Sequence, residues 1–250
     1  MNLSVREIKL NARKILDGHY RAAVGAALIV LTISLCFSML ISRFSYQDSK
    51  AAFLTGLSVS FILSLIEILF SSGLLYFFLK LGRGETTGAA DVFACFRMQP
   101  DRFLIAGFFI SLSYFIYCLP FFAAYEISRK SPLPALILAC VWGIFGTVLL
   151  ACFLLSTALF PFLLIDHAGQ MGAVESLKES ARLMKGHKGR LLHLNLSFIG
   201  WFLLALMSLS IGFLWVLPYY NTTLAGFYRD LTGEPALPPV PDSQGEAETF

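Results

Sequence analysis

The chain has 250 residues, of which 57% are hydrophobic and only 14% charged, whereas a soluble domain usually carries about 25% charged residues. This composition excludes an ordinary soluble domain and indicates a membrane protein. The net charge of +3 reflects an uneven distribution of Lys and Arg between loops, so we expect no nucleic-acid partner.

The first predicted element is a short basic amphipathic helix within residues 1–21. The run from Ser4 to Glu7 is typical of a capping box, and Gly18 would end the helix. We expect this helix to lie on the anionic inner leaflet, where each Lys or Arg contributes about 1 kcal/mol of attraction. Its apolar stripe comprises Val5, Ile8, Ala12, Ile15 and Leu16, with Arg6, Lys9, Arg13 and Lys14 around it.

A membrane domain is predicted over residues 22–231. Its apolar blocks are long enough to cross the hydrocarbon as helices, which takes about 20 residues. Their continuous hydrophobicity does not fit the alternation of barrel strands. The last block, Leu191 to Tyr228, has 38 residues, barely enough for two spans, with a turn at Ser208, Ser210 and Gly212. We predict an all-α, polytopic transmembrane helical bundle of six spans, with five spans as the alternative. The six spans are 22–42, 53–79, 103–125, 135–165, 191–208 and 212–229.

The distribution of Lys and Arg predicts the orientation of the chain. Fourteen of these residues precede the first span or follow the second and fourth spans, whereas four lie in the alternate loops. The positive-inside rule then predicts a multi-pass membrane protein with a cytoplasmic N-terminus. Arg229 would also lie inside if the sixth span returns, which would place the C-terminus in the cytoplasm.

A second amphipathic helix is predicted after the fourth span, where Val174, Leu177, Ala181 and Met184 form an apolar stripe. A weaker copy covers Thr87 to Phe96. The chain then contains three units, each an interfacial helix followed by a helical hairpin. Similar juxtamembrane chemistry without a true repeat explains the pattern equally well.

The segment 232–250 is rich in proline and acidic residues and has few apolar side chains to bury. We therefore expect a disordered tail.

Three short motifs resemble an uncharacterised bacterial integral-membrane family, domain of unknown function 975. The N-terminal helix also resembles that of the family, whereas the segment from Ala22 to Ile165 is similar only in hydropathy. The chain departs from the family at two positions: His187 stands where the family often has Asn, and Tyr20 where it often has Trp. The resemblance implies a bacterial cell-membrane location and no activity, because the family's function is not established. The motifs are Ser180 with Leu183-Met184-Lys185-Gly186-His187-Lys188, Leu196-Ser197-Phe198-Ile199-Gly200-Trp201, and Pro218-Tyr219 with Thr222, Ala225, Phe227 and Tyr228.

Glu67 is the one charge that the sequence places deep within a predicted span. An ionisable group there usually faces a bundle interior or a cavity, so Glu67 is a candidate intramembrane ion or proton site. The alternative is a protonated carboxyl group hydrogen-bonded to a Ser or Thr of a neighbouring helix.

Two further sets of residues are candidates for binding. Lys185, Gly186, His187, Lys188 and Arg190 form a basic, glycine-containing stretch that could contact a lipid phosphate or an acidic partner, although such clusters often serve only topology. Trp201, Pro218 and Tyr219 are candidates for helix packing or for lining a pocket.

No paired cysteine spacing and no catalytic motif such as H-E-x-x-H or G-x-S-x-G occurs, so we expect no enzyme, no metal site and no cofactor. The favoured hypothesis is a membrane protein that organises or regulates other membrane components or the envelope. It would contact membrane lipids and a membrane-protein partner or a second copy of itself. The alternative is a small transporter or channel for an ion, lipid or amphiphile that uses Glu67. An embedded enzyme would need polar residues clustered at one depth.

Overall fold

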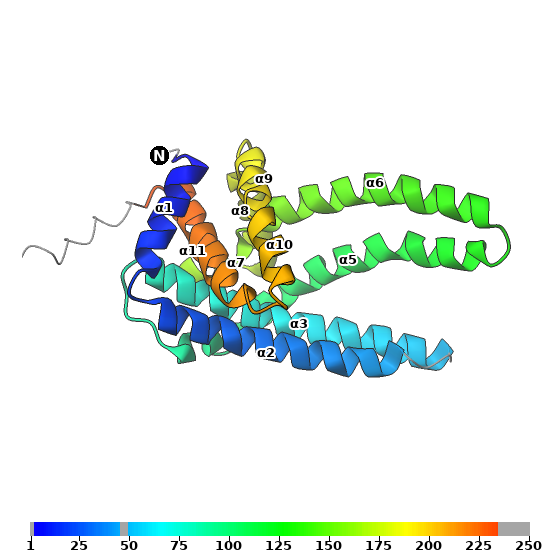
Figure 1. Cartoon of the computed structure of the whole chain (residues 1–250), viewed down its shortest axis with the longest axis horizontal. Coiled ribbons are helices and arrows are strands. Elements are labelled where there is room, and N and C mark those ends of the chain that lie inside the picture. The colour runs from blue at the N-terminus through cyan, green and yellow to red at the C-terminus, as the bar shows by residue number, and fades with distance from the viewer. Residues whose placement is uncertain (1–2, 46–49, 235–250) are drawn as a thin grey trace, which may run out of the picture.

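The computed structural model describes residues 3–45 and 50–234, and every secondary-structure element in these ranges is a helix (Figure 1). The all-α fold is confirmed. The helices are α1 (Val5–Leu16), α2 (Tyr20–Ser45), α3 (Lys50–Gly82), the 3-10 helix η1 (Ala89–Phe93), α4 (Ala94–Met98), α5 (Pro100–Ser128), α6 (Pro132–Thr157), α7 (Phe160–Asp166), α8 (Ala173–Leu183), α9 (Lys188–Leu196), α10 (Ile199–Met207) and α11 (Phe213–Thr232).

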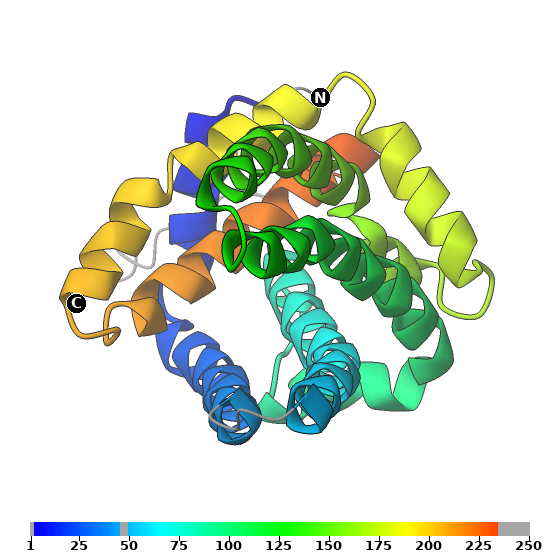
Figure 2. The same ribbon diagram turned by 90° about the vertical axis from the view of Figure 1, so that its right-hand side faces the viewer.

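Two helical hairpins, α2–α3 and α5–α6, run along the long axis of the molecule and project from the same end (Figure 1). Figure 2 shows their four helices end-on. The hairpins meet through α3 and α5, where the Phe61 and Phe108 rings lie edge to face at 5.7 Å and the Ser64 and Ser111 hydroxyl oxygens are 3.0 Å apart. Beyond this contact the hairpins diverge toward their tips (Figure 1).

Helices α1, α8, α9, α10 and α11 run across the hairpin axis at the other end of the molecule (Figures 1 and 2), and we call this assembly the base platform. Helix α11 packs against α1, α2 and α3, and α8 packs against α5, α6 and α7. The largest fully buried side chains gather where the platform meets the hairpins, and include Phe77, Phe78, Phe103, Phe162, Phe198, Phe227 and Tyr228.

Helix α3 divides into a buried part and an exposed part. No residue from Thr55 to Ile68 is buried, whereas Leu69, Phe77 and Phe78 are. Helix α3 therefore contributes its C-terminal half to the core and its N-terminal half to the projecting hairpin.

The predicted capping box of α1 is present: the Ser4 hydroxyl accepts from the Glu7 N–H, and the Glu7 carboxylate accepts from the Ser4 N–H. The predicted stripe is also apolar and continuous, but Ile8, Ala12 and Leu16 are almost fully buried, and α1 packs chiefly against α11. The protein, rather than the inner leaflet, covers this face.

Five helical stretches among the described residues are long and apolar enough to cross a membrane, as expected for a polytopic protein. The sixth predicted span is not one of them. Residues 212–229 do form a helix after a turn at 208–212, but α11 carries polar side chains such as Thr222 and Asp230, which are buried within the base platform. The five stretches are Tyr20–Arg43, Thr55–Gly82, Pro100–Ser128, Pro132–Asp166 and Lys188–Met207.

Two of these five stretches are interrupted. Helix α6 ends at Thr157 and α7 begins at Phe160, and the Ser180 hydroxyl group of α8 lies in this break. It donates to the Ser156 carbonyl oxygen at 2.8 Å and accepts from the Leu159 N–H at 3.1 Å. The other break, between α9 and α10, lies at Ser197 and Phe198.

The first three residues of the predicted tail, 232–234, belong to the described part of the chain. Thr232 is the last residue of α11, Gly233 caps the helix with a φ of 75°, and Glu234 makes hydrogen bonds. Residues 235–250 lie outside the described part of the chain.

Candidate functional site

The densest group of charged side chains lies in the base platform, where α3, α7 and α11 end. Arg83, directly after α3, donates through both terminal nitrogens to the Asp166 carboxylate at 2.7 and 2.8 Å. It also donates through Nε to Glu234 at 3.2 Å. The bonds to Asp166 and then to Glu234 raise the pKa of Arg83 above its ordinary value, whereas burial opposes this shift.

Two residues of α11 complete this ion-pair network. The Tyr228 hydroxyl donates to Asp166 at 2.7 Å, and its ring stacks on Phe162 with centroids 4.9 Å apart. Arg229 donates to Glu234 at 3.1 Å and to the Gly82 carbonyl oxygen. Burial, and then the bond to Asp166, raise the pKa of Tyr228 above its ordinary value.

A second ion pair joins both ends of the described chain. The Asp230 side chain is fully buried and accepts from Arg190 Nη2 at 2.6 Å and from the Leu3 N–H at 3.1 Å. Arg190 also donates to the Leu3 carbonyl oxygen at 2.6 Å. This arrangement fixes α9 and the start of α1 to the C-terminal part of α11.

These charges therefore hold helices together, because each carboxylate is engaged by a cation or a hydroxyl group. Sequence reasoning missed Asp166, Asp230 and Glu234, and left Arg229 unassigned. Their partners stand far away in the chain, with Arg83 and Glu234 separated by 151 residues. One signal was available: Arg83 and Asp166 both follow apolar blocks that end on the same predicted side of the membrane.

Glu67 lies at the base of the projecting hairpin, directly before the buried part of α3. It is half-buried, and its carboxylate accepts from the Ser34 hydroxyl group of α2 at 2.7 Å. Ser64, about one helical turn away on α3, shares the hydrogen bond with Ser111 of α5. The hydrogen-bond partner of Glu67 is thus a serine of a neighbouring helix, which is the kind of partner expected if Glu67 is not an ion site. Polar groups from α2, α3 and α5 lie close together at this level of the hairpins.

The basic stretch between α8 and α9 divides between two environments. Gly186 has a φ of 85°, a left-handed conformation that suits glycine, and Lys185 is exposed. Lys188 and His187 are half-buried, and His187 Nδ1 is a buried atom with no hydrogen-bond partner. Arg190 instead points into the platform toward Asp230.

The three aromatic and proline candidates are not brought together as one site. Trp201 of α10 is 42% exposed, whereas Tyr219 of α11 is 8% exposed and packs on Phe198 with ring centroids 5.0 Å apart. The Arg13 guanidinium of α1 lies over the Tyr219 ring at 5.3 Å. Pro218 is buried within α11, and its carbonyl oxygen accepts from the Thr222 hydroxyl group.

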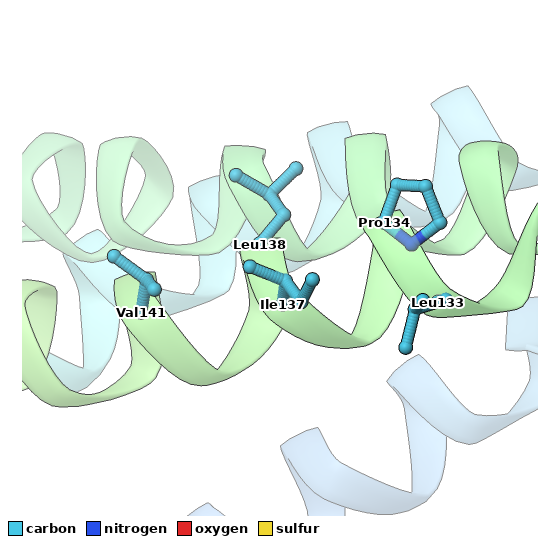
Figure 3. Close-up of a pocket in the computed structure, with 5 residues that line it drawn as sticks. All are labelled: Leu133, Pro134, Ile137, Leu138 and Val141. Carbon is cyan, nitrogen blue, oxygen red and sulfur yellow. The ribbon is translucent and has the colours of Figure 1, made fainter.

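A shallow apolar hollow of about 400 Å³ lies on the tip half of α6 (Figure 3). All its lining residues belong to α6, so it is a surface feature of one helix rather than an enclosed cavity. They are Leu133, Pro134, Ile137, Leu138 and Val141.

Comparisons with known proteins give a family and no individual relative. Neither the curated proteins nor the solved structures contain a match. The model of the family described as "Protein of unknown function (DUF975)" matches residues 1–234, which include both hairpins and the whole base platform. The chain therefore belongs to this family.

Proposed function

We propose that this protein organises or regulates other components of a bacterial cell membrane by binding them within the bilayer. The base platform would face the cytoplasm, because the predicted cytoplasmic loops, with fourteen Lys and Arg residues, connect at this end. The hairpin tips would lie at the opposite surface.

The observation that carries the proposal is an apolar stripe along α6. Its five residues recur at helical spacing on one face, and each is between 56% and 73% exposed. The hollow in Figure 3 lies on this stripe. Helices associate in lipid through close van der Waals packing. Exposed side chains beside a hollow can interlock with those of another helix, and this packing is closer than that of loosely ordered acyl chains. The stripe comprises Leu133, Ile137, Val141, Ile144 and Val148.

The test is affinity purification from native membranes after crosslinking, with mass spectrometry of the intact complex in mild detergent. We expect a protein partner, or a second copy of the chain, in a fixed ratio. Ile144→Trp changes the stripe and should abolish the association. Leu119→Trp on α5 is the matched control, because Leu119 is also exposed (50%) but lies off the stripe. Absence of any bound protein, or equal binding by both variants, would contradict the proposal.

A second candidate function, transport of an ion or amphiphile, rests on the Ser34–Glu67 hydrogen bond and the adjacent Ser64–Ser111 contact. These polar groups lie at the base of two hairpins that diverge toward their tips (Figure 1). Purified protein in liposomes should then carry a proton or cation flux that Glu67→Gln removes and that Glu126→Gln, near a hairpin tip, leaves unchanged. A flux no greater than that of empty liposomes would exclude ion transport.

A further inference from the structure

The third helical hairpin, formed by α9 and α10 together with α11, differs in direction from the other two. Helices α2, α3, α5 and α6 share the long axis of the molecule, whereas α9, α10 and α11 run across it in both views (Figures 1 and 2). Helices that cross a bilayer side by side share roughly one direction, with tilts of about 20° on average. If the first two hairpins span the membrane, the third therefore lies near the membrane plane.

The tips of the three hairpins differ in charge. The first tip carries Arg43 and Lys50, and the second carries Arg129 and Lys130, as suits segments that emerge into water. The third tip, at residues 207–212, has no charged residue, and none occurs anywhere from Leu191 to Tyr228. A tip of this composition is suited to remain in lipid.

The side chains on and around the third tip are apolar and strongly exposed. Leu209 is 88% exposed and Met207 82%, and Trp201 and Trp215 flank them at 42% and 55%. Soluble surfaces rarely leave so many neighbouring large apolar side chains in water. The other exposed apolar residues here are Ile199, Leu203, Leu204, Leu206 and Ile211.

The turn between α10 and α11 makes several hydrogen bonds within itself. The Ser208 hydroxyl donates to the Ala205 carbonyl oxygen and accepts from the Gly212 N–H at 2.9 Å, and the Ser210 N–H donates to the same carbonyl oxygen at 3.1 Å. Lipid offers no hydrogen bonds to backbone groups, so a turn that is closed in this way can remain in the apolar layer.

Basic side chains mark the other end of the same segment. Lys185 is exposed beside the start of α9, and Lys188 is its first residue. Anionic lipid headgroups attract such residues by about 1 kcal/mol each when they lie near the membrane surface. Charge thus matches the headgroups at one end of the third hairpin, and apolar side chains match the acyl chains at the other.

We infer that α9, α10 and α11 form an in-plane hairpin whose tip is embedded in the lipid leaflet on the platform side. The protein then crosses the bilayer with α2, α3, α5 and α6, the last of these continued by α7. The predicted spans 191–208 and 212–229 become one membrane-surface element. This assignment goes beyond the proposed function and does not depend on it.

Side-specific cysteine labelling tests the assignment. All five native cysteines are replaced by Ser or Ala, and Ser210→Cys, Lys130→Cys and Lys185→Cys are introduced singly into sealed vesicles of known orientation. A membrane-impermeant maleimide should label Lys130→Cys from one side and Lys185→Cys from the other. Ser210→Cys should react from neither side until detergent is added, with a rate at least tenfold lower than that of either control. Labelling of Ser210→Cys from the Lys130 side would show a spanning hairpin, and rapid labelling from the Lys185 side would show a tip in water; either result overturns the assignment.

Tryptophan fluorescence provides a second test that leaves the tip unmodified. With Trp142→Phe, the emission comes only from Trp201 and Trp215. Lipids brominated near the headgroup end of the acyl chain should quench it more strongly than lipids brominated near the chain end. Stronger quenching by the deep bromines would place these rings at the bilayer centre and contradict an in-plane hairpin, as would the absence of quenching by either lipid.

Discussion

Asp230 is the most deeply buried carboxylate among the residues that the structure describes. Its side chain is fully buried and accepts hydrogen bonds from Arg190 and from the Leu3 N–H. Removing one partner of a buried pair leaves the other charge without compensation, which usually costs about 3–5 kcal/mol. Arg190 retains 23% exposure, so water lessens this effect.

Asp230→Asn should therefore lower the free energy of unfolding by roughly 2–4 kcal/mol. The measurement is thermal unfolding in detergent followed by intrinsic fluorescence. Glu179→Gln is the control, since Glu179 pairs with an Arg182 side chain that is 77% exposed, and its loss should change stability by less than about 1 kcal/mol. Equal effects of the two substitutions would show that the buried ion pair contributes no more to the free energy of unfolding than the exposed pair does.

Cys95 of α4 should be unreactive in the folded protein. It is completely buried, and burial raises the pKa of its thiol to about 12, so the reactive thiolate is scarce at neutral pH. Treatment with N-ethylmaleimide followed by mass spectrometry should modify Cys95 only after denaturation. Lys185→Cys, at an exposed position outside the lengthwise hairpins, serves as the comparison, because the other four native cysteines lie on α2, α5 and α6. Rapid modification of Cys95 in the native protein would mean that the packing of α4 against α3 and α5 opens readily.

Among the elements, the third hairpin depends on a close approach of the α10 and α11 backbones at its turn. A Cβ atom on Gly212 would lie 2.6 Å from Ala205 Cα, and two other residues of this turn, Leu209 and Ser210, have positive φ. The sequence predicted this turn from its Ser and Gly residues, because turn chemistry is local. It could not predict that α11 runs across the other helices, because hydropathy records how apolar a helix is and not its direction.

Gly212→Ala should separate α10 from α11 and lower stability by roughly 1–3 kcal/mol, the usual range for overpacking. Gly200→Ala on α10 is the matched control, because no atom lies within 4 Å of its added Cβ and alanine favours a helix by about 0.5–1 kcal/mol. Unfolding midpoints in detergent that move in opposite directions would agree with this expectation. A Gly212→Ala midpoint equal to that of the parent protein would not.

At the scale of the whole molecule, the base platform contacts both lengthwise hairpins: α11 packs against α2 and α3, and α8 packs against α5 and α6. The sequence predicted the helices themselves, because uninterrupted apolar blocks leave no other structure for a backbone in lipid. It also predicted the order in which a short helix precedes each hairpin, although a true repeat stays a hypothesis. The sequence placed Arg83 and Asp166 on the same side of the membrane but did not predict their pairing, since pairing across 83 residues depends on where the helices end in space.

This network should make the stability of the platform depend on pH in the alkaline range. The fold raises the pKa of Tyr228 through burial and the bond to Asp166, so its contribution to stability is complete below the unfolded value of about 10. The contribution is lost progressively as the pH rises above that value. The unfolding temperature should fall more steeply between about pH 9 and 11.5 in the parent protein than in Tyr228→Phe. Tyr125→Phe, at an exposed position of α5, should retain the steep fall, and identical slopes for all three would contradict the role of Tyr228.

The burial of α1 against α11 has a consequence for biosynthesis. The ribosome makes α1 first and α11 last among the described helices, so Ile8, Ala12 and Leu16 have no permanent cover until about residue 230 has emerged. Both lengthwise hairpins can enter the membrane before then, since each can pair within itself. Assembly therefore ends with the closure of the platform. A nascent chain that stops before Asp230 would leave the translocon with the apolar face of its N-terminal helix exposed, which makes it a target for chaperones and membrane proteases.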